Sequence, residues 1–407
     1  MNAYAAISHR YWARPGGGQL VSAAAAFAMH KLGYMPVLTS PAEFDPEKYL
    51  DWFGIDLRGF PKVTLGFRLR AFGIYMRLLI WMPVAKAIRM YKPSYVLIDE
   101  FTYKPILKLK SRYGFKLIEY IHFPFEVYFK KELSDFAEKY GHGQDPYVQE
   151  RYGRFPMNIY WGLYLKLLPR YARENPFAAS DAVFANSTWT AKVAEQIYGE
   201  APVVLNPPIP PNTTIVDSPR PFEDRDPVVV MVGRFTEEKR YHWVIQSVMP
   251  RLIEEVPDVK LVIFGGAGTR TAYMYMDRLR SLIGELGLNG RVELMPDAPR
   301  KAINEAMDRA RAFLHATINE HWGVAVAEAM ARGLPPVVHK SGGAWTDLAE
   351  EGRFGLGYES AEEAAEALAK LLTDGKAWRS YAEAIPSRVA ELTLDKFAER
   401  LGAYIGR

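Results

Sequence analysis

The sequence predicts an α/β protein made of two doubly wound domains, each a parallel sheet covered by helices. Short apolar runs alternate with helical stretches in both halves of the chain, which is typical of repeated βαβ units. The first apolar run of each half leads into a loop that contains glycine, at Gly16 and at Gly233. Between the halves, residues 206–227 hold seven prolines, which stiffen the chain and exclude regular structure.

We therefore divide the chain into four segments. They are a Rossmann-like domain at 1–206, a proline-rich linker at 207–226, a second Rossmann-like domain at 227–390 and a closing helical segment at 391–407. We expect the two domains to face each other across a cleft, and the closing helix to cross back to the first domain.

Composition excludes several classes of protein. The chain has 407 residues, 49% of them hydrophobic, which suffices for two globular cores. It has no cysteine, so disulfides and thiolate chemistry are excluded and a reducing compartment is compatible. A net charge of +4 gives no indication of nucleic-acid binding. The apolar run Ala3–Ser8 is too short for a signal peptide, and no apolar run reaches the ~20 residues of a spanning helix. We expect a cytoplasmic protein.

In the first half, an alanine-rich helix at Gln19–Leu32 should end at Gly33, and a helix at Thr188–Tyr198 should begin at a cap formed by Asn186 and Ser187. The expected strands of this half are Ala3–Ser8, Met35–Thr39, Tyr95–Ile98, Lys116–Ile121 and Val183–Ala185, and Val203–Leu205 should end the domain.

One candidate ligand-binding residue in this half is His122. It directly follows the strand expected at Lys116–Ile121, at the carboxyl end where ligands bind in open α/β sheets. A structural histidine held by its neighbours is the alternative.

A basic, aromatic-rich stretch lies between Asp56 and Asp99, where the chain has no acidic residue. Its cations are Arg58, Lys62, Arg68, Arg70, Arg77, Lys86, Arg89 and Lys92. Such a stretch suits an anionic membrane surface, with Trp81 and its aromatic neighbours inserting into it. The alternative is a surface helix whose apolar face belongs to the core.

The second half should contain five strands and, after the fourth of them, a helix with a clear end signal. The helix Gly323–Arg332 has Gly333 just beyond its end, a common signal for helix termination. The expected strands are Val228–Val232, Val259–Phe264, Arg291–Leu294, Phe313–Ala316 and Val337–Val338.

Seven residues separate Glu320 from Glu328, and the expected start of the helix, Gly323, lies between them. The free backbone N–H groups of Gly323 and Val324 should point at a ligand above the strand ends, and a phosphate suits that position. Carboxylates that flank an anion site are suited to hydroxyl groups rather than to the anion. The segment therefore predicts a nucleotide-sugar site.

Two cations, Arg234 and Lys239, follow the first strand of the second half and should emerge at its ligand-binding edge. Fixed cations there would stabilise the charge that grows on a nucleoside diphosphate leaving group, without a metal. Gly233 belongs to the same loop, and Gly265 begins a second glycine loop that should line the nucleobase or the phosphates.

Together these features resemble the retaining GT-B glycosyltransferases of glycosyltransferase family 4. The resemblance rests on the paired glutamates, on the Ser341-Gly342-Gly343 loop after them and on residues 233–239. Within the family, the chain is most similar to mannosyltransferases that extend dolichol-linked oligosaccharide on the cytosolic face of the endoplasmic reticulum. That narrower resemblance is carried by Asn319–Gly323, His339–Gly343, Asn186–Thr190 and Ile121–Pro124.

The resemblance implies a nucleotide-sugar donor, with GDP-mannose favoured, and transfer of a hexose with retention of configuration. It assigns Glu320 to the donor sugar and Glu328 to the ribose. His122 would contact the donor sugar or phosphate, and Ser341 and Gly342 would also contact the donor.

The resemblance also gives a place to the loop of Gly16, Gly17 and Gly18, which would line the cleft beneath the diphosphate and the acceptor. A dinucleotide fingerprint is disfavoured because Val21 stands where its third glycine would be.

We expect front-face transfer assisted by the leaving phosphate, with no metal and no cofactor besides the donor. Asp224-Arg225-Asp226 has the D-x-D form of metal-dependent transferases, but its proline neighbours favour a charged linker. The expected partners are the donor, a lipid-linked glycan and an anionic membrane surface, and the protein would lie peripherally on the cytosolic face. The alternatives are a family 4 enzyme that uses a UDP-sugar and a soluble acceptor, a GT-B nucleotide-sugar epimerase and a sugar-nucleotide sensor without activity.

Overall fold

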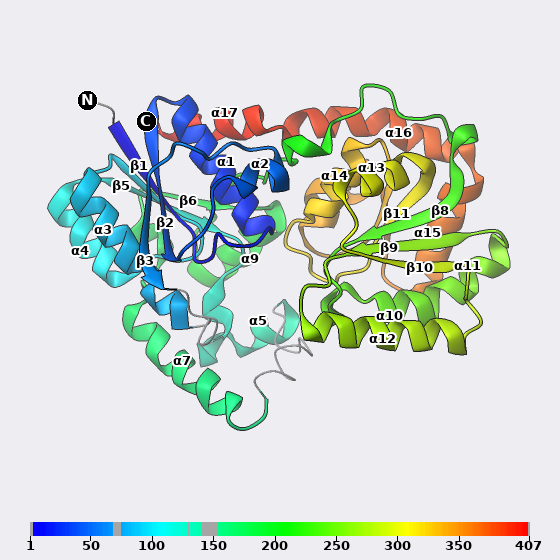
Figure 1. The fold of residues 1–407 in the computed structure, drawn as a ribbon, viewed down its shortest axis with the longest axis horizontal. Coiled ribbons are helices and arrows are strands. Elements are labelled where there is room, and N and C mark those ends of the chain that lie inside the picture. Colours follow the sequence, from blue (N-terminus) through cyan, green and yellow to red (C-terminus); the bar gives the residue numbers. More distant parts are fainter. Residues whose placement is uncertain (1–2, 68–74, 129, 141–152, 406–407) are drawn as a thin grey trace. The chain divides into compact units, whose positions relative to one another are not determined.

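A computed structural model describes residues 3–67, 75–128, 130–140 and 153–405 (Figure 1). Two compact units make up the chain. The first takes the residues up to Asn212 together with those from Leu392 onward, and the second runs from Thr213 to Glu391.

The first unit has a seven-stranded sheet in the order β3-β2-β1-β4-β5-β6-β7, with every pairing parallel. The strands are β1 (Ala3–Ser8), β2 (Tyr34–Ala42), β3 (Lys62–Phe67), β4 (Tyr95–Ile98), β5 (Lys116–Ile121), β6 (Ala182–Ala185) and β7 (Val203–Val204). The inner strands β1, β4, β5 and β6 are mostly buried on both faces, which explains why they are nearly continuous apolar runs in the sequence.

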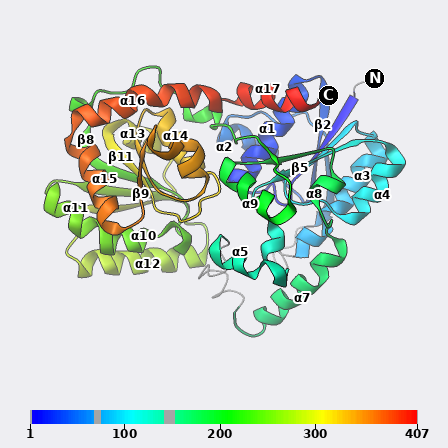
Figure 2. The same ribbon diagram turned by 180° about the vertical axis from the view of Figure 1, so that it is seen from behind.

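Helices cover both faces of this sheet. The helices of this unit are α1 (Gly17–Lys31), α2 (Lys48–Phe53), α3 (Trp81–Tyr91), α4 (Lys104–Tyr113), α5 (Ser134–Lys139), α7 (Met157–Tyr171), α8 (Pro176–Ala179), α9 (Thr188–Tyr198) and α17 (Leu394–Ile405). Of these, α5 and α7 pack mainly against short 3-10 segments rather than on the sheet. Helices α3 and α4 lie together on one side of the unit, and α1 and α17 lie side by side on the other (Figures 1 and 2).

The predicted helix signals in the first unit are confirmed. Gly33 follows α1 with φ 89°, a left-handed conformation that glycine adopts without strain. At the start of α9, the Ser187 hydroxyl accepts a hydrogen bond from the Thr190 N–H at 3.1 Å.

Helix α17 belongs to the first unit although it lies at the other end of the chain. Its buried side chains, Phe397, Leu401 and Ile405 among them, pack against α1. The Tyr95 hydroxyl donates to the Ile405 carbonyl at 2.6 Å, and the Ile209 N–H donates to the Leu392 carbonyl.

The second unit has a six-stranded parallel sheet in the order β10-β9-β8-β11-β12-β13. The strands are β8 (Asp226–Val232), β9 (Lys260–Gly265), β10 (Val292–Pro296), β11 (Ala310–His315), β12 (Pro336–His339) and β13 (Leu356–Tyr358). The helices are α10 (Tyr241–Trp243), α11 (Met249–Glu255), α12 (Arg270–Glu285), α13 (Arg300–Arg309), α14 (Val324–Ala331), α15 (Ala361–Thr373) and α16 (Gly375–Val389).

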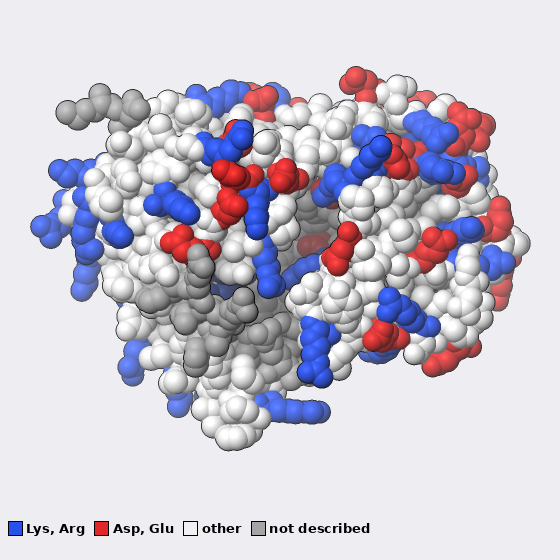
Figure 3. Space-filling model, viewed as in Figure 1, with Lys and Arg blue, Asp and Glu red and all other residues white. Residues whose placement is uncertain are grey.

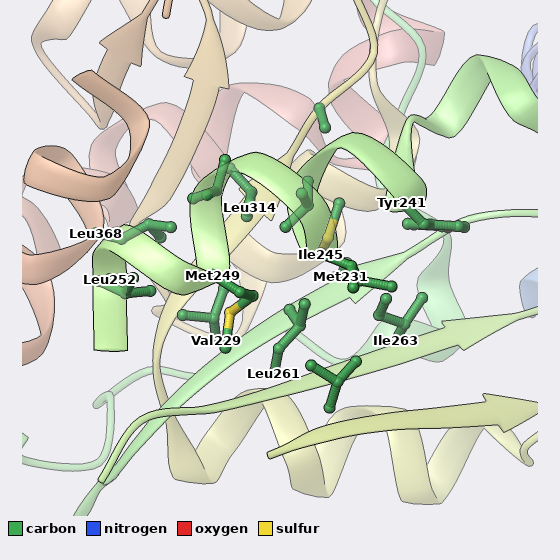
Figure 4. Close-up of a cluster of buried hydrophobic side chains, with 14 of the residues drawn as sticks. Val229, Met231, Tyr241, Ile245, Met249, Leu252, Leu261, Ile263, Leu314 and Leu368 are labelled. Carbon is green, nitrogen blue, oxygen red and sulfur yellow. The ribbon is translucent and has the colours of Figure 1, made fainter. Parts of the chain in front are cut away.

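The core of the second unit joins its sheet to the helices of one face. Side chains of β8 and β9, such as Val229 and Ile263, meet Ile245 and Met249 from the helical segment that leads into α11 (Figure 4). Leu368 of α15 belongs to the same cluster.

Three strands were not predicted, and one of them, β7, has only two residues. Strand β3 lies at the edge of the first sheet and contains Gly66, and β13 has only three residues, so neither leaves a clear apolar pattern.

Where the structure describes the basic stretch, apolar side chains of α3 face the core, whereas Arg58, Lys62, Lys86, Arg89 and Lys92 are exposed. Val84 and Ile88 of α3 are buried in the core, and Trp81 packs against two core clusters. Arg77 lies over the Phe125 ring and 3.7 Å from the Glu100 carboxylate, with its side chain 19% exposed. Arg77 therefore directs its charge to Glu100 rather than to a membrane surface, and Trp81 is partly buried against the core. Contact of the rest of the stretch with an anionic membrane stays a prediction. Arg68 and Arg70 lie outside the described residues.

Among the described residues, no helix combines the length and the apolar character that crossing a lipid bilayer requires.

Candidate functional site

In the second unit, three side chains meet at the carboxyl edge of the sheet. His315 is the last residue of β11, Lys239 lies in the loop after β8, and Glu320 lies between β11 and α14. The Lys239 ammonium donates to Glu320 Oε2 at 2.8 Å, and His315 Nε2 lies 2.9 Å from the same oxygen. The side chains are 17% exposed for Lys239, 20% for Glu320 and 5% for His315.

The charges of this cluster follow from its geometry. Burial alone would raise the pKa of Glu320, but the Lys239 ammonium and the His315 contact hold that pKa well below its usual value. Burial lowers the pKa of His315, and the charge of Lys239 lowers it further. The cluster is therefore an ion pair beside a neutral histidine, with both charged groups near the protein surface.

Arg234 differs from Lys239. Its side chain is 72% exposed and pairs with Glu238 at 2.7 Å on the surface. An exposed ion pair of this kind contributes little energy, so the guanidinium is free to turn toward an anionic ligand.

The glycines of the neighbouring loops have a packing role. A Cβ on Gly265 would lie 2.2 Å from the Gly233 carbonyl oxygen, and a Cβ on Gly233 would lie 2.8 Å from the Tyr241 hydroxyl. The Gly233 N–H donates to the Phe264 carbonyl at 3.0 Å. Because neither glycine has a side chain, the loops after β8 and β9 can pack directly against each other.

Glu328, on α14, is 4% exposed and lies beside an unpredicted cation. Arg300 Nη2 approaches Glu328 Oε1 at 3.0 Å, and the Thr213 hydroxyl lies 3.5 Å from the same oxygen. Arg300 stands at the start of α13, and its side chain is 33% exposed. The partly exposed guanidinium of Arg300 therefore holds the buried carboxylate of Glu328 in place.

The start of α14 is held by backbone contacts. Gly323 precedes the helix with φ 98°, a conformation that disfavours any side chain, and the Val324 N–H lies in the first turn, where it has no acceptor within the helix. Gly342 has φ 79°, and a Cβ there would lie 2.2 Å from the Glu320 carbonyl oxygen. The Ser341 hydroxyl accepts from the backbone N–H of Asn319 at 2.8 Å.

In the first unit, polar side chains converge on Asp99 at the carboxyl edge of the sheet. The His9 ring bonds to the Asp99 carboxylate, the Ser22 hydroxyl donates to it at 2.9 Å, and His122 Nε2 lies 3.6 Å away. A Cβ on Gly18 would lie 3.0 Å from His9 Cε1 and 3.6 Å from His122 Nε2. Gly18 thus leaves room for the two rings.

This cluster is also charged. Burial would raise the pKa of Asp99, but His9 and His122 hold it below its usual value. Burial would lower the pKa of His9, and Asp99 raises it above its usual value instead. The Nε2 atoms of both histidines lack a hydrogen-bond partner among the described residues.

The remaining predicted residues are accounted for as follows. Gly16 caps α1 in an extended conformation, and Gly17 is the first residue of that helix. Asp226 begins β8 and pairs with Arg309 at 3.1 Å, while Asp224 ends a short 3-10 turn. Among the described residues, no group of three His, Asp or Glu side chains is placed to hold a metal ion.

The sequence interpretation missed Asp99, His9, His315 and Arg300. Asp99 and His315 had a signal, because each is a polar residue at the end of a buried apolar strand. Arg300 had none, since its partner Glu328 is distant in the sequence.

Most of the second unit is similar to a known family. Residues 214–388 match the family described as glycosyl transferases group 1. A human GDP-Man:Man(3)GlcNAc(2)-PP-Dol alpha-1,2-mannosyltransferase is 30% identical over 207 residues, which are 48% of this chain and 42% of that protein. The Neurospora crassa protein of the same name is 30% identical over 215 residues, covering 47% of this chain and 38% of that protein. The matches thus span less than half the length of these relatives.

Solved structures match the whole chain. That of Anabaena HepE in complex with UDP and glucose has a TM-score of 0.67 at 16% identity and covers 100% of this chain and 99% of that one. Sucrose-phosphate synthase from Thermosynechococcus elongatus has a TM-score of 0.66 at 16% identity, covering 99% of this chain and 98% of that one. The predicted fold class, GT-B with two doubly wound domains, is confirmed.

Proposed function

We propose that the chain is a retaining hexosyltransferase that moves mannose from GDP-mannose to a lipid-linked glycan, because residues 214–388 match the glycosyl transferases group 1 family. The named activity of the human and Neurospora crassa relatives supports the choice of donor and acceptor. The observation that carries the proposal is the cluster of Lys239, Glu320 and His315 at the ligand-binding edge of this domain.

In this proposal the cations of the second unit hold the donor's diphosphate. Lys239 is already fixed by Glu320, and the exposed Arg234 closes on the phosphates when the donor binds. The backbone N–H groups of Gly323 and Val324, at the start of α14, add partial positive charge to that of the two cations. Charge-assisted contacts of this kind strengthen as the leaving diphosphate gains negative charge, so they favour the transition state.

The two glutamates take different parts of the donor. Glu320 accepts hydrogen bonds from the hydroxyls of the sugar, and Glu328 accepts them from the ribose, while Ser341, Gly342, Gly233 and Gly265 line the same loops. We assign His122, on the first unit, to the donor sugar or phosphate.

Transfer then proceeds on one face of the sugar. The bond between the anomeric carbon and the phosphate oxygen breaks, the acceptor oxygen attacks from the same side, and its proton passes to the leaving phosphate. We propose that no metal takes part, because the cations supply the charge stabilisation that a metal would.

We also propose peripheral attachment to the cytosolic face of an anionic membrane. Exposed cations on α3 and α4 support it, on the side of the molecule where Lys and Arg gather (Figure 3). They are Lys86, Arg89, Lys92, Lys108 and Arg112. Each is worth on the order of 1 kcal/mol near an anionic bilayer.

A thermal-unfolding screen with GDP, GDP-mannose, UDP and UDP-glucose tests the donor. A ligand at 100 times its Kd stabilises the folded state by about 2.7 kcal/mol, so the preferred nucleotide raises the melting temperature most. Product analysis with a lipid-linked acceptor then distinguishes transfer from epimerisation, which needs no acceptor. A melting temperature unchanged by every nucleotide would refute the proposal.

A further inference from the structure

Helix α7 carries large apolar side chains on its outer side. Phe155, just before the helix, is 79% exposed, and Ile159 and Leu163 are 61% and 50% exposed. The four-residue spacing places Ile159 and Leu163 on one face, with Phe155 a turn earlier. Single exposed apolar residues are normal on a protein surface, whereas several large ones on one face form a patch that marks an interaction site.

The helix is nevertheless firmly placed. Its opposite face buries Tyr164 and Leu168 in a cluster with Leu78 and Tyr103. The Tyr75 hydroxyl donates to the Tyr160 carbonyl at 2.8 Å. The outer apolar face is therefore a feature of a packed helix, and nothing among the described residues covers it.

The charges around α7 indicate what covers this face. From Arg154 to Arg173 the sequence has no acidic residue, and Arg154, Lys166 and Arg170 are exposed. In Figure 3 the end of the molecule where α7 lies shows uncharged atoms with Lys and Arg beside them and no Asp or Glu. An apolar face flanked by cations matches an anionic lipid surface, into which such helices insert by about 5–10 Å.

The position of α7 connects this face to the proposed chemistry. Its cluster includes Phe101 and packs against Phe125, which follow the carboxyl ends of β4 and β5. Asp99 and His122 lie at those same strand ends. Helix α7 is thus attached to the ligand-binding edge of the first sheet.

We propose that α7 lies in the surface of an anionic membrane, with Phe155, Ile159 and Leu163 in the acyl boundary and the flanking cations at the headgroups. A lipid-anchored acceptor in that membrane would then reach the edge of the sheet that bears His122. The first statement adds α7 to the membrane attachment proposed above, and the second rests on the proposed transfer to a lipid-linked acceptor.

The inference is tested by binding of the full chain to vesicles of phosphatidylcholine and phosphatidylserine. Replacing Phe155, Ile159 and Leu163 together with Ser should weaken vesicle binding by about tenfold or more, because the apolar contribution to binding scales with buried area. A matched control replaces Tyr273 and Met274 of α12, which are 53% and 55% exposed, and should bind as the wild type does.

Apolar insertion also makes a prediction about salt. At 1 M salt the Debye length falls to about 3 Å, which screens the cations but not the apolar contact. Wild-type binding should therefore fall only in part, and the residual binding should be lost in the Ser variant.

A second measurement does not depend on weakened binding. Because the chain has no cysteine, Ile159→Cys and Met274→Cys each give a single labelling site for an environment-sensitive fluorophore. The label at position 159 should shift to the blue when vesicles are added, and the label at position 274 should not.

Either of two results would overturn the inference: unchanged vesicle binding by the triple Ser variant, or a label at position 159 that stays in water. A wild type that self-associates and ignores vesicles would also overturn it, since a second copy would then cover α7. Nucleotide-dependent melting is measured on the same proteins. A wild type that binds vesicles but no nucleotide would therefore refute the proposed function alone.

Discussion

The ion pair of Lys239 and Glu320 makes the most direct test of the candidate site. We compare the wild type with Lys239→Met, Glu320→Gln and the double variant. The two groups are 2.8 Å apart and at most one-fifth exposed, so they form a partly desolvated, charged hydrogen bond. Such bonds contribute about 1.5–3 kcal/mol, and we expect a coupling free energy of about 2 kcal/mol in the unfolding of the second unit.

A matched control lies on the surface of the same unit. Lys340 and Glu363 are 2.9 Å apart, but their side chains are 36% and 42% exposed. Exposed pairs contribute about 0–1 kcal/mol, so the same cycle on this pair should give a much smaller coupling. If the two cycles gave equal values, the partial burial of the Lys239 pair would carry no energetic meaning and our reasoning would be wrong.

The pH dependence of unfolding adds an independent check. The folded pKa of Glu320 lies well below its usual value, so its ion pair stabilises the protein above the unfolded pKa of about 4.3. This contribution is lost as the pH falls from there through the lower folded pKa. Urea unfolding of the wild type and of Glu320→Gln should therefore converge on acidification. Turnover of Lys239→Met at neutral pH should fall on the order of 10²-fold, because the cation acts on the leaving diphosphate.

Three further predictions concern the rest of the site. Glu328→Gln should mainly raise the KM for the donor, because the ribose is remote from the reacting carbon. Arg300→Ala should have the same effect, because it releases the Glu328 carboxylate, and a fall in kcat instead of a rise in KM would contradict the ribose assignment. Transfer should persist in EDTA, and a loss that manganese or magnesium restores would refute the metal-free mechanism. Gly18→Ala places a Cβ 3.0 Å from the His9 ring and should lower both activity and melting temperature. The control Gly284→Ala meets no atom within 4 Å and should raise the melting temperature slightly, so equal effects of the two variants would contradict the close packing of Gly18.

The residues at the ligand-binding edge of each sheet could be predicted from the sequence. Buried parallel strands are short apolar runs, and ligands lie beyond their carboxyl ends. That rule was enough to place His122 after β5 and Lys239 in the loop after β8. The helix expected at Gly323–Arg332 is confirmed as α14, and Gly333 follows it in a left-handed conformation as its place in the sequence indicated.

The partners of these residues could not be predicted, because they depend on tertiary packing. His315 lies five residues from Glu320 but meets it only through the loop between them, and Arg300 reaches Glu328 from another helix. Hydrophobic periodicity also fails to distinguish a core from a lipid surface. For this reason Trp81 was assigned to a membrane although it is partly buried against two core clusters.

The pairing of α17 with α1 makes the first unit discontinuous along the chain. The second unit, from Thr213 to Glu391, is in effect an insertion into the first. During synthesis the inserted unit can therefore complete its core first. The first unit must wait for α17, with the apolar surface of α1 uncovered until then. A fragment that ends at Asn212 should accordingly aggregate, and a peptide of residues 392–407 added in trans should restore its solubility.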